Sequence, residues 1–210
     1  MLEHEDMSAE KRKEFILRCM NNIDRLKRLL SDVSLITRMD DAPASIIKEN
    51  VDLSQIVAET VDDCEPMACR RGIMIENDII CPLPFYGNQS LLISVFHNLI
   101  DNAIAYSGGT RVKLRLLNHD TDKIVISVSD NGSGVAAEHL PHLFERFYRI
   151  DKGRSRATGG TGLGLSIVKN AVILHNGTIS VKNQASGGLI FTIIFKNGNE
   201  NKTDNSLGRT

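Results

Sequence analysis

A continuous helical seam near the N-terminus constrains the fold of this chain more than any other sequence feature. Between residues 9 and 39, apolar or small residues recur at alternating spacings of three and four. This spacing predicts one long amphipathic helix with a seam like that of a coiled coil. Leu29 and Ile36 widen the stripe, which suits a helix bundle, and the helix cannot bury the stripe without partner helices. The seam residues are Ile16, Cys19, Ile23, Leu26, Leu30, Val33 and Thr37.

The hydrophobic pattern changes after this helix. Residues 43–50 are expected to be a linker, because Asp40 to Pro43 interrupts the helical pattern. Residues 51–196 mix helical and strand patterns, which predicts an α+β domain: a two-layer α/β sandwich with helices on one face of a mixed sheet. Residues 197–210 are expected to be a disordered tail. We expect a helix from Asp52 that ends or kinks near Pro66, and helices over 90–106 and 164–175. We expect strands over 73–75, 111–117, 124–129, 178–182 and 189–195.

Composition excludes several classes of protein. The chain has 210 residues with 25 Lys+Arg against 26 Asp+Glu, so it lacks the basic surplus of an electrostatic nucleic-acid binder. Its apolar runs are far shorter than the roughly 20 residues of a membrane span, and its first residues do not resemble a signal peptide. The four cysteines (Cys19, Cys64, Cys69 and Cys81) lack metal-type spacing, so we interpret them as reduced core residues of a cytosolic protein.

The glycines are unevenly distributed. Ten of the 16 lie between Gly132 and Gly188, and five of those lie between Gly153 and Gly164. Four local patterns in and before this region carry the candidate chemistry.

The first pattern is a pair of asparagines on the predicted helix 90–106. Asn98 and Asn102 are four residues apart, so both amides project from one helix face. Their oxygens suit a hard cation such as Mg²⁺ if phosphate and water complete its shell. Taken alone, solvent-exposed asparagines are the simpler interpretation.

The second pattern follows the predicted strand 124–129. Asp130 leads into Gly132-Ser133-Gly134, so its carboxylate can form the floor of a pocket with backbone close to a ligand. It could accept a hydrogen bond from the exocyclic amine of adenine, whereas guanine presents a carbonyl there. Taken alone, a β-turn explains the same residues.

The third and fourth patterns surround a glycine-rich segment. Residues 143–149 concentrate three aromatic side chains, which form either a plain loop anchor or a hinge for the segment that follows. Lys152, Gly153 and Gly159 then suggest a flexible lid. The run from Gly160 to Leu165 opens a helix, whose free N–H groups favour phosphate, although it matches neither the dinucleotide fingerprint nor a Walker loop.

Together, these patterns resemble the catalytic ATP-binding domain of sensor histidine kinases, in the superfamily shared with DNA gyrase, MutL and heat-shock chaperone ATPases. The N box corresponds to residues 98–107, the first glycine box to 130–134, the F box to 143–149 and the second glycine box to 160–165. Residues 1–42 resemble the second helix of the family's dimerisation hairpin, and 51–196 the catalytic domain.

The resemblance implies a role for each matching residue. Asn102 would ligate Mg²⁺, Asn98 would support the ion or the phosphates and is the one catalytic candidate, and Asp130 would take the adenine amine. Tyr106 would lie beside the nucleotide, and Arg149 and Lys152 near the phosphates. The remaining ATP-binding candidates come from the glycine boxes and the F box: Gly132, Gly134, Phe144, Gly160, Thr161, Gly162, Leu163, Gly164 and Leu165.

The chain departs from the family pattern at two points. Ala105 replaces a common lysine, which removes one phosphate-facing cation. The phosphorylatable histidine is expected in a His-Glu-x-x-x-x-Pro context, but His4-Glu5 lacks the proline and the other five histidines lie within the predicted catalytic domain. We therefore expect the acceptor histidine to lie on a separate or missing helix.

These residues define the expected function. Asn98 stands where gyrase-type ATPases place a general-base glutamate, and an amide cannot take that proton. We expect a kinase that holds Mg-ATP for transfer to a histidine and serves a response regulator. We expect the chain to be a cytoplasmic fragment of a membrane-anchored homodimer. The alternatives are a regulatory nucleotide-binding module with little transfer, or a gyrase- or chaperone-like ATPase switch.

Overall fold

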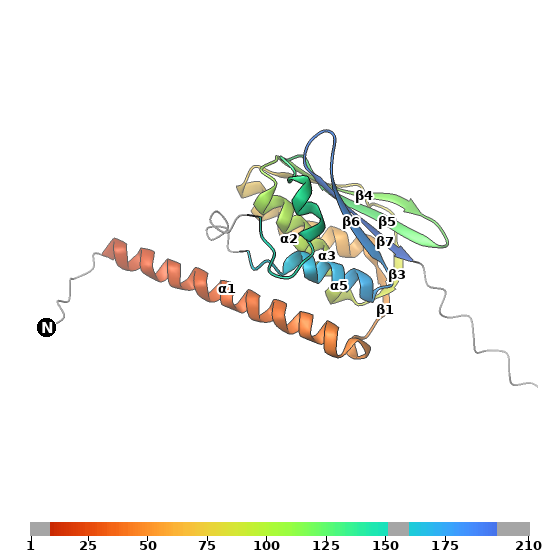
Figure 1. Cartoon of the computed structure of the whole chain (residues 1–210), viewed down its shortest axis with the longest axis horizontal. Helices are drawn as coiled ribbons and strands as arrows, with labels where there is room; N and C mark the ends of the chain where they lie inside the picture. Colours follow the sequence, from red (N-terminus) through yellow and green to blue (C-terminus); the bar gives the residue numbers. More distant parts are fainter. Residues whose placement is uncertain (1–8, 151–159, 197–210) are drawn as a thin grey trace, which may run out of the picture.

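The computed structural model describes residues 9–150 and 160–196. One long helix is followed by a domain in which helices and strands are interspersed (Figure 1). Within the described residues, no helix is long and apolar enough to span a membrane. The elements are α1 (Ala9–Asp41), η1 (Pro43–Ser45), β1 (Glu49–Asp52), α2 (Leu53–Arg70), β2 (Met74–Asn77), β3 (Pro84–Gly87), α3 (Gln89–Tyr106), β4 (Arg111–His119), β5 (Lys123–Asp130), η2 (Ala137–His142), α5 (Gly164–Leu174), β6 (Thr178–Asn183) and β7 (Leu189–Lys196).

The domain is built on a five-stranded mixed sheet in the order β2-β4-β5-β7-β6. β2 pairs with β4 in parallel, and the other three pairs are antiparallel. β7 alternates buried and half-buried side chains from Leu189 to Phe195, the period of two expected of a strand with one face on the core. A separate antiparallel pair, β1 and β3, lies outside this sheet.

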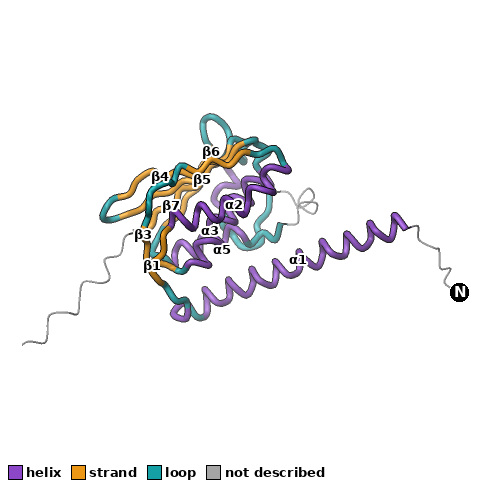
Figure 2. The backbone as a smooth tube through the Cα atoms, turned by 180° about the vertical axis from the view of Figure 1, so that it is seen from behind, coloured by secondary structure: helices purple, strands orange, loops and turns teal. Residues whose placement is uncertain are grey.

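Three helices cover one face of the sheet, as the sequence predicted (Figure 2). α3 packs between α2 and α5, and its residues Phe96, Leu99 and Ile100 are fully buried. Side chains of the three helices and of the inner strand faces form one continuous core. The two-layer α+β architecture is therefore confirmed.

α1 lies beneath the helical layer and contacts α5 near its own C-terminal end (Figures 1 and 2). Ile36 and Met39 are buried there. The predicted seam is exposed instead: Leu26 and Leu30 keep 64% and 73% of their surface accessible, and Ile16, Ile23 and Val33 are also exposed. Only the last turns of the helix are therefore packed on the domain, and the seam has no partner among the described residues.

Several local expectations were wrong. α2 does not end near Pro66 but continues to Arg70, because its buried face extends through Cys64 to Ala68 and packing outweighs the roughly 3 kcal/mol that an internal proline costs. Strands β1 and β3, a separate short pair, were not predicted. The segment 43–50, expected as a linker, contains η1 and the start of β1.

The cysteine interpretation was half right. All four thiols are free, and Cys64 is buried, but Cys69 and Cys81 are exposed. The predicted disordered tail (197–210) lies outside the described residues.

Candidate functional site

The polar side and the C-terminal end of α3 contact two glycine-containing segments, and this convergence defines the candidate site. A methyl group on Gly164 would lie 2.5 Å from Oδ1 of Asn98, and one on Gly160 would collide with the hydroxyl of Tyr106. At the end of the helix, the carbonyl of Ser107 accepts a hydrogen bond from the N–H of Ser133 at 3.1 Å. The N box, both glycine boxes and their loops thus meet along one helix face.

Asp130 lies at the end of β5 as a buried carboxyl, 6% exposed. Its Oδ1 accepts the N–H of Gly132 at 2.9 Å and its Oδ2 the N–H of Leu189 at 3.3 Å. Burial raises the pKa of this carboxyl, and the two N–H donors act in the opposite direction. A carboxylate offers about four acceptor positions, so two remain for a ligand amine.

Glycine is required around this carboxyl. A methyl group on Gly132 would collide with the carbonyl of Ser107, and one on Gly188 with the carbonyl of Asp130. Gly134 and Gly188 also have positive φ angles of 68° and 85°. The position of the Asp130 carboxyl therefore depends on close backbone approaches that a side chain would prevent.

The two asparagines of α3 are held differently. Nδ2 of Asn98 donates to the carbonyl of Ser94 at 2.8 Å and to its hydroxyl at 3.2 Å, which orients Oδ1 toward Gly164. Asn102 lies one turn later, half-buried, and its amide makes no hydrogen bond with any described residue. A free amide oxygen beside an oriented one fits a hard, oxygen-preferring cation such as Mg²⁺.

The second glycine box leads directly into α5, and its residues are half-buried except for the buried Leu163. Gly162 has a φ of 75°, and its carbonyl accepts the N–H of Phe147 at 2.8 Å. Leu163, the N-cap of α5, makes no side-chain capping bond with any described residue, while its own N–H donates to the hydroxyl of Thr161 at 3.2 Å. The N–H groups of the first turn and the positive end of this helix therefore lie at the second glycine box, an arrangement that suits phosphate. Leu165, the last residue of the box, is half-buried in the first turn of α5.

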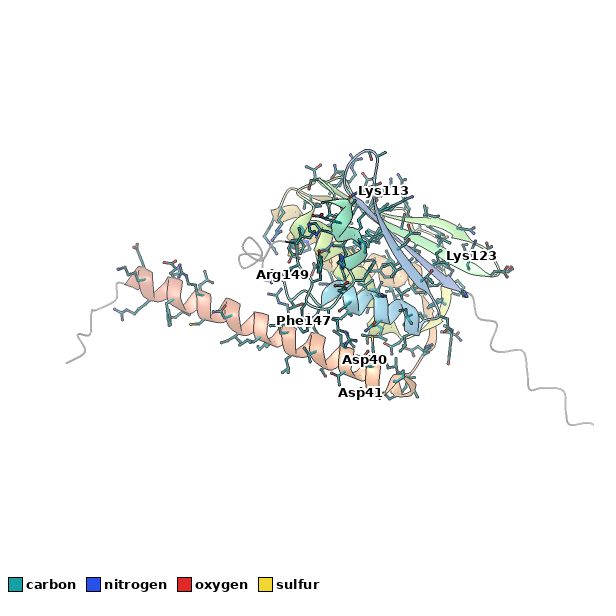
Figure 3. The ribbon with its side chains drawn as sticks, viewed as in Figure 1. Asp40, Asp41, Lys113, Lys123, Phe147 and Arg149 are labelled. Atoms are coloured by element: carbon teal, nitrogen blue, oxygen red, sulfur yellow. The ribbon has the colours of Figure 1, made fainter. Side chains whose placement is uncertain are left out.

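The F box contacts both the sheet and the second glycine box. Phe144 packs edge-to-face on Phe191 of β7, with ring centroids 6.2 Å apart, so the structure places it in a packing contact. Phe147 is 63% exposed and adopts a φ of 62°. Figure 3 shows Phe147 and Arg149 on the side of the domain that faces α1, and the half-buried Arg149 lies near Gly160 and Gly162.

α1 makes two polar contacts with these loops. The hydroxyl of Thr161 donates to Oδ2 of Asp32 at 2.9 Å, and Nη2 of Arg146 lies 2.6 Å from Oδ2 of Asp40. Burial raises the pKa of the Asp32 carboxyl, against the hydrogen bond from Thr161 and the charge of Arg28. The second glycine box is therefore tied to the long helix.

Sequence reasoning missed several positioning residues. Ser107, Asp32 and Gly188 received no role, although the Gly187-Gly188 pair belongs to the glycine cluster and could have indicated the last of them. Asn131 was also missed: its Oδ1 accepts the N–H groups of Thr110 and Arg111 at 2.9 and 2.8 Å. Lys152, Gly153 and Gly159, expected to form a lid, lie outside the described residues.

Comparison with known families identifies the fold that carries this site. Residues 87–199, just over half of the chain, match the family described as histidine kinase-, DNA gyrase B- and HSP90-like ATPase. The chain belongs to this ATPase family. The match includes α3, the Asp130 loop and the second glycine box, the three segments that meet in the site.

Curated relatives of this family member are sensor kinases. The sensor-like histidine kinase SenX3 of Mycolicibacterium smegmatis is 38% identical over 170 residues, which are 80% of this chain and 44% of SenX3. The sensor histidine kinase CpxA of Escherichia coli is 34% identical over 80% of this chain and 36% of its own length. The chain thus spans less than half the length of these relatives.

Solved structures show the same fold. A full-length structure of ShkA in complex with AMPPNP has a TM-score of 0.74 and 26% identity, and it covers 92% of this chain and 40% of ShkA. The similarity to ShkA therefore extends over most of this chain. The family, the fold and the histidine-kinase resemblance of the sequence analysis are confirmed.

Proposed function

We propose that this chain binds Mg-ATP and transfers the γ-phosphoryl group to a histidine on a separate phosphoacceptor helix. The observation that carries the proposal is the convergence on α3, where Asn98, Tyr106 and Ser107 contact Gly164, Gly160 and the Gly132 loop. A nucleotide needs a base pocket, a cation site and a phosphate site close together, and these contacts support the proposal because they bring the N box and both glycine boxes together.

The base pocket is assigned to Asp130. As a carboxylate already holding two backbone N–H groups, it accepts the exocyclic amine of adenine with its remaining lone pairs. Such a charge-assisted bond contributes roughly 1.5–3 kcal/mol. Guanine presents a carbonyl oxygen at that position and is repelled, so the site selects ATP over GTP.

The cation and phosphates are assigned to Asn102, Asn98 and the start of α5. A bound Mg²⁺ would neutralise charge on the phosphate oxygens, with Asn102 as ligand and Asn98 in support. The backbone from Gly160 to Leu165 wraps the phosphates, with Arg149 beside it, while Tyr106 flanks the nucleotide. Ala105 supplies no cation, so we expect weaker affinity than in a chain with lysine there.

The chemistry is transfer to imidazole, not fast hydrolysis. Asn98 cannot act as a general base toward water, and phosphoryl transfer depends mainly on positioning and charge stabilisation. We assign α1 as the second helix of a dimerisation hairpin, because its exposed seam of Leu26, Leu30 and neighbouring residues fits a partner helix. In this proposal the chain is the cytoplasmic kinase part of a homodimeric, membrane-anchored sensor that serves a response regulator.

Transfer to a supplied hairpin tests the function. With γ-labelled Mg-ATP and a separate hairpin domain carrying an acceptor histidine, we expect acid-labile label on the hairpin. Asn102→Ala should lower the rate about a hundredfold, whereas Asn118→Ala, on the exposed end of β4, should leave it unchanged.

Two results would contradict the proposal. Binding of Mg-ATP without label on a saturating hairpin would favour a regulatory nucleotide-binding module. Rapid phosphate release without any hairpin would favour an ATPase switch.

A further inference from the structure

A second cluster of metal-ligating side chains lies between α2 and α3, apart from the nucleotide site. It consists of Cys64 from α2 and of His97 and Asp101, one turn apart on α3. One potential ligand atom from each residue lies within 4.8 Å of those of the other two. His97 and Asp101 directly precede Asn98 and Asn102, so they point about 100° away from that pair around the helix axis.

The cluster contains an unsatisfied polar atom. Oδ1 of Asp101 is buried and has no hydrogen-bond partner among the described residues. Its other oxygen, Oδ2, lies 3.2 Å from Nδ1 of His97. Native proteins rarely leave a buried carboxylate oxygen without a partner, because the lost hydration costs free energy that a bound group restores.

The geometry allows a ligand to enter. Cys64 is 1% exposed and forms the inner end of the cluster, whereas the side chains of His97 and Asp101 are 46% and 37% exposed. Asp63 lies close enough to raise the pKa of both Cys64 and His97, so it adds negative potential at this opening. Burial raises the Cys64 pKa to about 12, so without a cation the sulfur remains protonated.

We propose that Cys64, His97 and Asp101 form a three-ligand site for Zn²⁺ or a similar borderline divalent cation. Thiolate, imidazole and carboxylate together favour such an ion over Mg²⁺ or Ca²⁺, which take oxygen ligands. Three protein ligands leave the fourth tetrahedral position to water on the solvent side. On binding, the cation takes the sulfur's electron pair and the thiol proton passes to solvent. The site could not be predicted from the sequence, because its ligands come from two helices and form no short metal-binding motif.

Cobalt binding to the whole chain, without nucleotide, tests the proposal. Co²⁺ reports a thiolate ligand by a charge-transfer band in the near ultraviolet, which Zn²⁺ should abolish by displacement. We expect the wild-type band to saturate at one Co²⁺ per chain. Cys64→Ala should lose it, and His97→Gln should weaken binding at least about tenfold, since even outer partners of metal ligands contribute about 10- to 100-fold.

Cys69→Ala is the matched control, because Cys69 is an exposed thiol on the same helix. It should bind Co²⁺ as the wild type does. His97→Gln changes a partly exposed residue and leaves the core intact, so it remains informative if Cys64→Ala unfolds. Absence of the band in the wild type, or its persistence in Cys64→Ala or at full strength in His97→Gln, would overturn the site.

Discussion

At the scale of single residues, the site depends on backbone approaches and on buried titratable groups. Asp130 is buried under glycines that cannot carry side chains, and Asn98 is oriented by Ser94. The types of these residues are readable from the sequence. The contact partners of these residues cannot be predicted from the sequence. Ser107, Gly188 and Leu189 are brought to the site by the tertiary fold and belong to no local sequence pattern.

His175 makes the stability depend on pH. It is 3% exposed, its Nε2 accepts the N–H of Asn88 at 2.9 Å, and burial lowers its pKa below 6.5. The unfolded chain therefore binds the proton first as pH falls. The contribution of His175 to the unfolding free energy is complete above pH 6.5 and is lost below it, by at most about 1.4 kcal/mol per pH unit.

Urea unfolding at several pH values measures this loss. His175→Gln should flatten the decline below pH 6.5, whereas His119→Gln, an exposed change, should retain it. His97, whose pKa is raised by Asp101, acts in the opposite direction: its contribution is present below 6.5 and is lost as pH rises through its folded pKa. An unchanged slope in His175→Gln would contradict the assignment.

Gly188→Ala should be more destabilising than Gly72→Ala. Both glycines have positive φ, 85° and 68°, so each substitution costs about 1–2 kcal/mol of backbone strain. A methyl group at Gly72 meets nothing within 4 Å, whereas at Gly188 it collides with the Asp130 carbonyl. The collision should bring the Gly188→Ala loss to about 3 kcal/mol or more. Chemical denaturation measures both variants, and equal losses would contradict this account of the pocket floor.

At the scale of elements, tertiary packing determines the extent and the buried face of a helix where the sequence pattern allows more than one interpretation. α2 runs through Pro66 because one face of it stays buried to Ala68. α1 is helical over the whole range predicted from its hydrophobic period, yet only its C-terminal turns are packed on the domain. Hydrophobic periodicity identifies an apolar helix face, but it does not indicate whether that face packs within the same chain or against a second chain.

Two substitutions in α1 distinguish its packed C-terminal turns from its exposed seam. Ile36→Ala removes a buried side chain and should lower the unfolding free energy by about 2–4 kcal/mol. Leu30→Ala changes a side chain that is 73% exposed and should stay within about 0.5 kcal/mol in dilute solution. Urea unfolding of both variants measures this difference. A large loss for Leu30→Ala would show that the seam is already covered in the isolated chain.

At the scale of the whole molecule, the sequence predicted the two layers of the fold. The five strands of the main sheet and the four long helices were expected from hydrophobic patterns in the sequence. β1, β3 and the contacts of Asp32 and Asp40 were not, since short strands and docking contacts arise from tertiary packing. The proposed Zn²⁺ site also joins α2 and α3, and the sequence spacing of its ligands matches no known metal-binding motif.

The central claim, that the α3 site binds Mg-ATP, is tested most directly by thermal unfolding with and without nucleotide. At a hundredfold excess over the dissociation constant, Mg-ATP should stabilise the wild type by about 2.7 kcal/mol, and GTP much less. Asp130→Asn should abolish this stabilisation, while Asp122→Asn, an exposed change in the β4–β5 turn, should preserve it. An undiminished ATP shift in Asp130→Asn, or no shift in the wild type, would contradict the account.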